Sequence, residues 1–290
     1  NRTSCNNHWR NFFMKNIIKQ IPFVNRSYQF YKEKQYKSQF ATNYYGCFWG
    51  VFNTFEEAIQ AAPKTKSIGY DNEELAQEYQ QMLENNNWEN QGDSIFLYDY
   101  PVLFWLNLII NSNSTNVFDF GGNVGVHYYS YRKYLEQSKK ITSNTNFKWT
   151  VCDLPEIIKA GKKIAEKREV KYLDFTSKFE DIVNKEIFLG GGVIQYVENF
   201  PEKLLSNYKP QHLLINRIPL YDGQQFVSLQ NGGKVFYPQY IFNKTEFIDG
   251  LTNIGYELID IWGGTGSCYI PFHPEKSVNS YSGLYFRLRN

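Results

Sequence analysis

The sequence predicts an α/β fold with a mostly parallel sheet, and two observations predict it. From residue 117 onward, short apolar segments alternate with helix-like segments, as in a doubly wound sheet. The first apolar segment ends in a turn with closely spaced glycines, which lets the backbone approach a nucleotide because glycine has no Cβ. We therefore expect a Rossmann-like sheet that binds a nucleotide-type cofactor at its strand ends.

Hydrophobic periodicity and turn signals place the individual elements. Strands are expected over residues 117–120, 148–152, 170–173, 187–190, 212–218, 256–262 and 282–288, with a helix over 244–254. Before the sheet, helices are expected over 1–40, from Thr54, over 71–84 and over 101–110, with an irregular or extended connector over 43–51. Thr54 can cap its helix together with Glu57, as in a capping box. The chain is thus divided into a mainly helical N-terminal extension, 1–100, and a main domain, 101–290.

Charge is unevenly distributed along the chain, although the net charge is only +2. Residues 1–45 hold eight Lys and Arg residues against the single acid Glu33, and the remainder has 23 basic against 28 acidic residues. Apolar side chains recur among these cations at near-helical spacing: Trp9, Phe12, Phe13, Ile17, Ile18 and Ile21. This stripe could lie on an anionic membrane surface, or pack on the main domain or on a partner such as a glycosyltransferase. An acidic main region argues against nucleic-acid binding.

The four cysteines, Cys5, Cys47, Cys152 and Cys268, lie far apart and form no Cys-x-x-Cys pair. We expect reduced thiols, a cytoplasmic location and no metal site. Contact with the inner face of the membrane stays open as an alternative. The longest apolar run, over 102–110, is too short to span a bilayer.

The glycine turn itself distinguishes between cofactor classes. Dinucleotides need Gly-x-Gly-x-x-Gly, but Asn123 stands at the second required glycine. Asp119, just before the glycines, would repel a pyrophosphate but suits a ligand that carries ammonium and sulfonium groups. The next strand also ends in an acid, Asp153, which is placed to bind ribose hydroxyls. The balance favours S-adenosylmethionine (SAM).

The chain resembles class I SAM-dependent methyltransferases, and over most of its length it is similar to a methyltransferase family of bacterial surface-polysaccharide loci. The segments that carry the resemblance are 118–122 with 125–128, 153–156, 192–196, 270–274 and 281–285. The resemblance implies that the last two strands pair as an antiparallel hairpin at the sheet edge, and that 101–290 is a SAM-dependent methyltransferase domain. The class usually has glycine where Asn123 stands; asparagine tolerates a left-handed backbone next most easily, so the turn is expected to survive.

The resemblance also implies cofactor-binding roles. The turn, formed by Gly121, Gly122, Asn123 and Gly125, would lie beneath the methionine portion, with Asp119 stabilising its ammonium directly or through water. Asp153 would bind the ribose and Leu154 would pack near the adenine. Asp174, followed by Phe175, would accept from the adenine amino group, unless it is a plain surface carboxylate. Gly191 and Gly192 would let the backbone pass close to the methyl donor.

A hydroxyl acceptor would benefit from a general base within hydrogen-bond reach. The candidates are His273, His127 and Tyr196. His273 lies in a proline-flanked loop and could instead be only an ordered loop residue. His127 falls in the first turn of a helix, where the helix dipole would lower its pKa and keep it neutral. Arg217 could hold a phosphate or carboxylate of the acceptor, or form a surface salt bridge.

Three functions follow from these observations. The leading one is a SAM-dependent methyltransferase, with O-methylation of a sugar or another small or glycan acceptor in surface-polysaccharide synthesis, the polysaccharide part being implied by the resemblance alone. The second is an NAD(P)-linked sugar-nucleotide oxidoreductase, although the required glycine pattern and a Tyr-x-x-x-Lys pair are missing. The third is a catalytically silent methyltransferase-like module that binds a glycosyltransferase. The acceptor and the oligomeric state stay open.

Overall fold

A seven-stranded sheet forms the centre of the computed structural model, which describes residues 22–42, 45–70, 73–84, 95–110, 115–142, 147–198, 200 and 202–289. The strand order is β11-β12-β7-β6-β3-β4-β5. The strands span β3 (Thr115–Phe120), β4 (Phe147–Cys152), β5 (Leu173–Thr176), β6 (Ile187–Gly191), β7 (His212–Ile218), β11 (Tyr256–Gly263) and β12 (Ser282–Leu288). Strands β3 to β7 run parallel, whereas β12 is antiparallel to both β7 and β11. The predicted α/β fold, with its antiparallel C-terminal hairpin, is confirmed.

The order of the sheet also separates it from a dinucleotide-binding domain. That domain has the order 3-2-1-4-5-6. Here the last strand in sequence, β12, is inserted between β7 and β11 and reverses direction. This arrangement does not favour the oxidoreductase reading.

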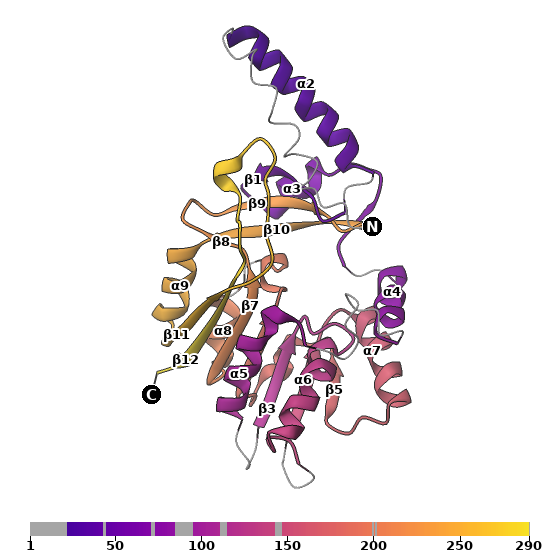
Figure 1. The fold of residues 1–290 in the computed structure, drawn as a ribbon, viewed down its shortest axis with the longest axis vertical. Helices are drawn as coiled ribbons and strands as arrows, with labels where there is room; N and C mark the ends of the chain where they lie inside the picture. The colour runs from indigo at the N-terminus through magenta and orange to yellow at the C-terminus, as the bar shows by residue number, and fades with distance from the viewer. Residues whose placement is uncertain are drawn as a thin grey trace.

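Two layers of helices cover the sheet because alternate residues of each strand face opposite sides. On one side, Val117 of β3 packs in a core with α5 (Tyr100–Ile109), α6 (Val126–Gln137) and α7 (Pro155–Lys167). On the other, Phe118 packs with η3 (Phe179–Ile182), α8 (Glu202–Tyr208) and α9 (Lys244–Asn253). Figure 1 shows α5 and α6 in front of β3, and α9 beside β11.

Most sheet strands begin and end within two residues of their predicted bounds, but one prediction was wrong. Residues 170–172 precede β5 instead of forming it. Helix α7 ends at Lys167 and is followed by a left-handed residue, Glu169 (φ 50°), and the Val170 N–H donates back to the Ala165 carbonyl over 3.1 Å. Val170 is therefore part of the C-terminal capping motif of the helix. Its apolar side chain is the reason that a strand was predicted to start here.

A second sheet lies next to the first and was not predicted. Its order is β1-β9-β10-β2, with β8 paired to β10. The strands span β1 (Phe48–Phe52), β2 (Ser67–Ile68), β8 (Leu220–Tyr221), β9 (Phe226–Asn231) and β10 (Val235–Asn243). Figure 1 shows β1, β9 and β10 stacked beyond the ends of β7. The signal that could have found the β9–β10 hairpin is Asn231-Gly232-Gly233 between two apolar segments.

The second sheet joins both sides of the boundary expected at residue 100. Strand β1 pairs with β9, so that Phe48 lies opposite Gln230, and β2 pairs with β10. The N-terminal part also contains α2 (Pro22–Phe40), α3 (Phe55–Ala61) and α4 (Glu73–Glu84). Thr54 caps α3 as expected, accepting from the Glu57 N–H over 3.1 Å. The first 100 residues thus contribute strands as well as helices.

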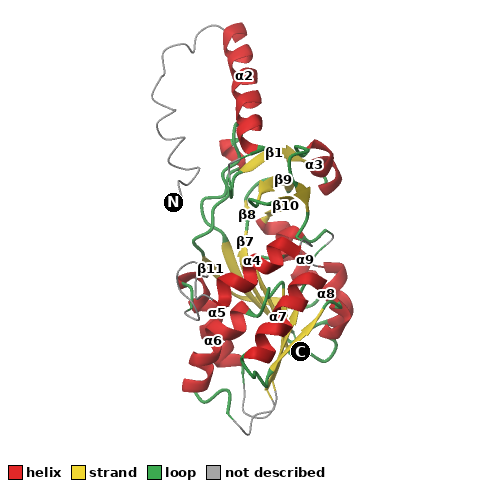
Figure 2. Ribbon diagram, turned by 90° about the vertical axis from the view of Figure 1, so that its right-hand side faces the viewer, coloured by secondary structure: helices red, strands yellow, loops and turns green. Residues whose placement is uncertain are grey.

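Helix α2 projects from the rest of the molecule (Figure 2). Its last turns are anchored by Tyr36, whose hydroxyl donates to the Phe48 carbonyl over 2.7 Å, and by the buried Phe40. Tyr28, Phe30 and Tyr31 are exposed on the same helix. The apolar stripe expected over Trp9 to Ile21 lies outside the described residues. Among the residues that are described, no helix is both long and apolar enough to cross a membrane.

The cysteines differ in state. Cys152 and Cys268 are free and buried, as expected. Cys47 is disulfide-bonded, so the expectation of a reduced thiol was wrong at this position. Within the described ranges, no three His, Cys, Asp or Glu side chains are grouped in a way that could hold a metal ion.

Candidate functional site

The glycine turn connects β3 to α6 and follows the edge of β4. Gly121 (φ 68°) donates its N–H to the Cys152 carbonyl over 2.8 Å. A Cβ on Gly121 would lie 2.4 Å from the Val193 side chain, and one on Gly122 would lie 2.4 Å from Oδ2 of Asp119. Neither distance is tolerable for a side chain, so both positions require glycine.

Asn123 adopts the left-handed conformation that its place in the turn was expected to require. Its φ is 55°. Its Oδ1 accepts from the Val124 N–H over 2.7 Å, and its own N–H donates to Oδ2 of Asp153 over 2.8 Å. The prediction that asparagine preserves the turn is confirmed.

Asp153 stands at the end of β4, directly beside the turn. It is half-buried, and its other oxygen, Oδ1, accepts from the Leu154 N–H over 2.8 Å. Burial raises the pKa of Asp153 to about 6, against the opposing effect of these two hydrogen bonds. Leu154 is exposed next to it, before α7. The ribose contact of Asp153 and the adenine contact of Leu154 stay predictions.

Asp119 is fully buried, and its expected contact with an ammonium group, directly or through water, stays a prediction. Its oxygens accept from Nδ1 of His127 at 2.9 Å and from Nε1 of Trp149 at 3.0 Å. Gly122 covers the same carboxylate from the turn side. The structure thus gives Asp119 the role of holding the imidazole of His127.

His127 lies in the first turn of α6, mostly buried, with its ring stacked on Tyr131 at 5.7 Å between centroids. Burial lowers the pKa of His127, but the carboxylates of Asp119 and Asp99 outweigh it, and the pKa is raised above its ordinary value. The prediction of a lowered pKa was wrong because paired carboxylates act more strongly than a helix dipole.

The end of β6 approaches His127 closely. A Cβ on Gly191 would lie 2.7 Å from Cε1 of His127. Gly192 (φ 73°) donates its N–H to the Asn216 carbonyl of β7 over 2.8 Å. The structure therefore brings these two glycines, His127 and the turn together, as the sequence predicted.

Asp99 also belongs to this group, and sequence reasoning missed it. It ends η2 (Leu97–Asp99) and is only 2% exposed. Its Oδ1 accepts from Nδ2 of Asn216 over 2.8 Å, while Oδ2 has no hydrogen-bond partner among the described residues. In the sequence, an aspartate just before a proline-led helix resembles an N-cap, but Asp99 makes no capping bond with its side chain.

Arg217 lies near the end of β7 with a strained, left-handed backbone (φ 58°). Its guanidinium lies 4.6 Å from the centre of the Tyr98 ring, and Nη1 donates to the Tyr98 hydroxyl over 3.3 Å. It is half-buried and close enough to lower the pKa of Asp99. The arginine is thus part of the site, not of a surface salt bridge remote from it.

Tyr196 connects the site with the second sheet. It ends η4 (Ile194–Tyr196), and its hydroxyl donates to Oε1 of Gln230 in β9 over 2.8 Å. Its ring contacts Tyr70 and Tyr237 edge-on, at 5.2 and 5.1 Å. Burial raises the pKa of Tyr196 to about 12, which does not favour a role as general base.

His273 is not brought to the site. It lies in the segment between β11 and β12, half-exposed, with Nδ1 3.6 Å from Oε1 of Glu275. The neighbouring Phe272 contacts the Tyr36 ring of α2. Figure 1 shows this segment reaching the level of β1, beyond the second sheet. This place is that of an ordered loop residue, the alternative that the sequence left open, and a role of His273 as general base stays a prediction.

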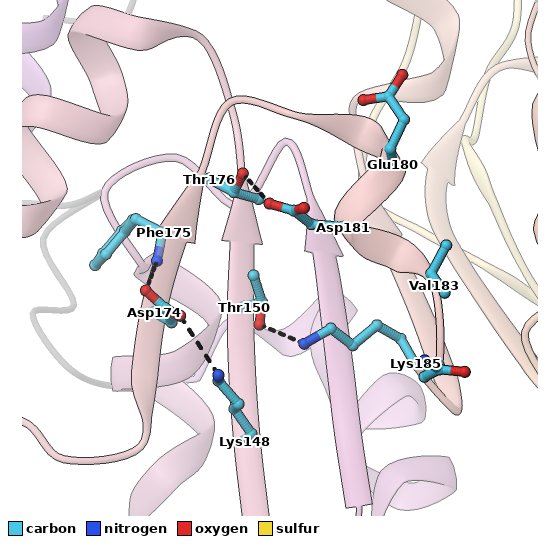
Figure 3. A pocket seen from close by; sticks show the side chains of 10 residues that line it. Lys148, Thr150, Asp174, Phe175, Thr176, Glu180, Asp181, Val183 and Lys185 are labelled. Carbon is cyan, nitrogen blue, oxygen red and sulfur yellow. Dashed lines mark hydrogen bonds and ion pairs between the residues drawn. The ribbon is translucent and has the colours of Figure 1, made fainter.

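Asp174 and Phe175 have different surroundings at the edge of the sheet. Asp174 is the second residue of β5, lies opposite Thr150, and is paired with Lys148 at 3.6 Å. It lines a cavity of about 480 Å³ on the other side of the sheet edge (Figure 3), together with Lys148, Thr150, Phe175, Thr176, Glu180, Asp181, Val183, Asn184 and Lys185. The Phe175 side chain is buried against Gly161 of α7 and beneath Gly125. Asp174 is thus a largely exposed ion-pair residue, and Phe175 belongs to the core.

Comparison with known proteins gives likeness in fold only. The chain matches no family model, and no curated protein matches it. Among solved structures, it is similar to 1,6-didemethyltoxoflavin-N1-methyltransferase of Burkholderia thailandensis with bound S-adenosylhomocysteine, at 12% identity and TM-score 0.45, covering 74% of this chain and 88% of that one. It is also similar to magnesium protoporphyrin IX methyltransferase of Synechocystis with bound SAM, at 13% identity and TM-score 0.42, covering 76% and 99%. A SAM-dependent methyltransferase of Clostridium acetobutylicum matches at 8% identity and TM-score 0.43, covering 75% and 98%. At these values, none of the three assigns an activity to this chain.

Proposed function

We propose that the protein is a SAM-dependent methyltransferase that acts on a small-molecule or glycan acceptor. The observation that carries the proposal is the hydrogen bond from Asn123 to Asp153, which ties a glycine turn to an acid at the next strand end. The turn follows β3, whose neighbours β4 and β6 lie on opposite sides of it. In open α/β sheets, ligands bind at such a switch point, outside the carboxyl ends of the strands.

The residues present fit SAM better than a dinucleotide. Carboxylates border the turn, with Asp119 behind it and Asp153 beside it, and both would oppose a pyrophosphate. The unpartnered oxygen of Asp99 is an acceptor, which suits a cationic amino-acid portion. Asp153 keeps further lone pairs for a ribose diol.

When bound, SAM supplies a methyl group on a sulfonium, which a nucleophile accepts by in-line attack. The chain's own contribution is alignment and the exclusion of water. Asp153 binds the ribose, and Gly191 leaves room beside His127 because it has no side chain. Asp119 holds Nδ1 of His127, so Nε2 is the atom through which this residue can hold a proton at the site. Of the three predicted base candidates, His127 lies there, with its pKa raised above the ordinary 6.5.

For the acceptor, we propose a sugar hydroxyl, methylated on oxygen in surface-polysaccharide synthesis. The family resemblance supports this class. A cluster of Tyr70, Tyr196 and Tyr237, with Gln230 hydrogen-bonded to Tyr196, supports it further where the second sheet meets the strand ends. Aromatic faces combined with a few placed polar groups are typical of small-molecule sites.

Calorimetric titration with SAM and S-adenosylhomocysteine tests the proposal, with NADH and NADPH as the competing ligands. We expect micromolar binding of the SAM pair, lost in Asp153→Ala and retained in Asp174→Ala, a matched control at the neighbouring strand. Binding of NADH or NADPH alone would instead favour the oxidoreductase. Binding of neither class would favour the silent partner-binding module.

A further inference from the structure

The unpartnered oxygen of Asp99 points to a specific ligand contact. We infer that Asp99, and not Asp119 of the glycine motif, receives the ammonium group of the cofactor's amino-acid portion. The inference rests on the proposed function. It names a residue of the site that the sequence pattern does not reveal.

The first step is that Asp119 has no room for a ligand. Both of its oxygens already accept from ring N–H groups, of His127 and Trp149, and its side chain is fully buried. Gly122 lies directly against Oδ2, on the side of the turn. A ligand ammonium would have to displace His127 to reach this carboxylate.

The second step is that Asp99, although it is also buried, differs from Asp119 in its hydrogen-bond partners. Asn216 fixes one oxygen, while the other, Oδ2, makes no hydrogen bond of ordinary length within the described part of the chain. The Tyr131 hydroxyl, which likewise lacks an ordinary-length partner there, is the donor that faces Asp99. Gln195, only 2% exposed, likewise has an unpartnered oxygen, Oε1, and its amide nitrogen donates to the Arg217 carbonyl over 3.3 Å. Buried acceptors without a donor are costly. An ammonium carries three donors and no acceptor, so it matches what Oδ2 of Asp99 lacks.

The third step concerns charge. The groups that face Asp99 are His127, Arg217, Tyr131 and Asn216. Burial raises the pKa of Asp99 above its ordinary value, against the opposing effects of His127, Arg217 and the Tyr131 and Asn216 side chains. An acidic oxygen next to a guanidinium is complementary to a zwitterionic amino acid, with the ammonium at Asp99 and the carboxylate towards Arg217.

A pair of ligands isolates this contact. S-adenosylhomocysteine carries the amino-acid group, whereas 5′-methylthioadenosine keeps the adenosine and sulfur but lacks that group. We expect the wild type to bind S-adenosylhomocysteine more tightly. In Asp99→Asn, affinity for S-adenosylhomocysteine should fall by about 10- to 100-fold, with little change for 5′-methylthioadenosine, because a hydrogen bond to a charged group is lost.

Three comparisons make the result decisive. Asp153→Asn should weaken both ligands equally, since both contain the ribose. If Asp99→Asn weakens both equally, or neither, Asp99 is structural and the inference is overturned. If the wild type binds neither ligand, the proposed function fails instead. A structure of the wild-type complex with S-adenosylhomocysteine decides the point even if Asp99→Asn does not fold: an amino nitrogen within hydrogen-bond distance of Oδ2 of Asp99 supports the inference, and one at Asp119 overturns it.

Discussion

The backbone N–H of Asn123 donates to the Asp153 carboxylate over 2.8 Å, and this bond joins the turn after β3 to the end of β4. The left-handed backbone of Asn123 aims the N–H group at that acid. The shape of the turn and the place of the expected ribose contact are therefore set together. A substitution at either residue should therefore change the conformation of the other.

Asn123 should tolerate glycine better than alanine. Both substitutions remove the side-chain bond to Val124, but only glycine adopts φ near 55° without strain. We expect Asn123→Ala to lower the free energy of unfolding by about 1–2 kcal/mol more than Asn123→Gly. Urea unfolding of both variants measures the difference. Equal stability of the two would show that the left-handed conformation is not maintained.

Asp153 should make stability fall as pH rises. Its pKa is raised from an ordinary 3.8 to about 6 in the folded chain. Between these values the unfolded chain has released the proton and the folded chain has kept it, so raising the pH favours unfolding. Asp153→Asn cannot titrate and should gain about 1–3 kcal/mol relative to the wild type from pH 4 to pH 7. Urea unfolding at several pH values checks this; a constant difference would mean an unshifted pKa.

Gly191 should not accept a side chain. Its Cβ would meet Cε1 of His127 at 2.7 Å, so Gly191→Ala must displace the ring. We expect a loss of about 1–3 kcal/mol in unfolding free energy and at least about tenfold weaker S-adenosylhomocysteine binding. Gly263→Ala, whose Cβ would have an ordinary 3.4 Å contact with Ser280, is the matched control and should change neither quantity. If Gly191→Ala binds S-adenosylhomocysteine as tightly as the wild type, the end of β6 is not part of the binding site.

His127 should titrate above its ordinary pKa of 6.5, which NMR of the imidazole resonances can measure. Although burial opposes the charge, the Asp119 and Asp99 carboxylates favour it. The raised pKa means that the stabilisation is present below pH 6.5 and is lost as the pH rises through the folded-state value. Asp119→Asn should bring the pKa of His127 down. An unchanged value in that variant would show that Asp119 is not its main partner.

Local sequence patterns were sufficient to predict most strands of the seven-stranded sheet and the conformation of the glycine turn. Apolar alternation placed most strands, and the tolerance of asparagine for a left-handed backbone predicted the state of Asn123. Two failures were local, namely the β9–β10 hairpin and the end of α7, whereas those at the site depend on contacts between distant segments. Asp99 meets Asn216, and His127 gains its charge from carboxylates on two other elements. No spacing in the sequence predicts these contacts, because each forms only when the sheet has folded.

The pairing of β1 with β9 has a consequence for biosynthesis. Strand β1 leaves the ribosome early, but its partner is made only after β3 to β7. The backbone N–H and C=O groups of β1 stay unpaired until most of the chain has been synthesised. Such long-range strand pairing is slow and leaves the chain prone to aggregation. A shortened protein that begins after β1 would leave the apolar β9 as a bare edge strand. Strand β1 is therefore expected to be needed for soluble expression.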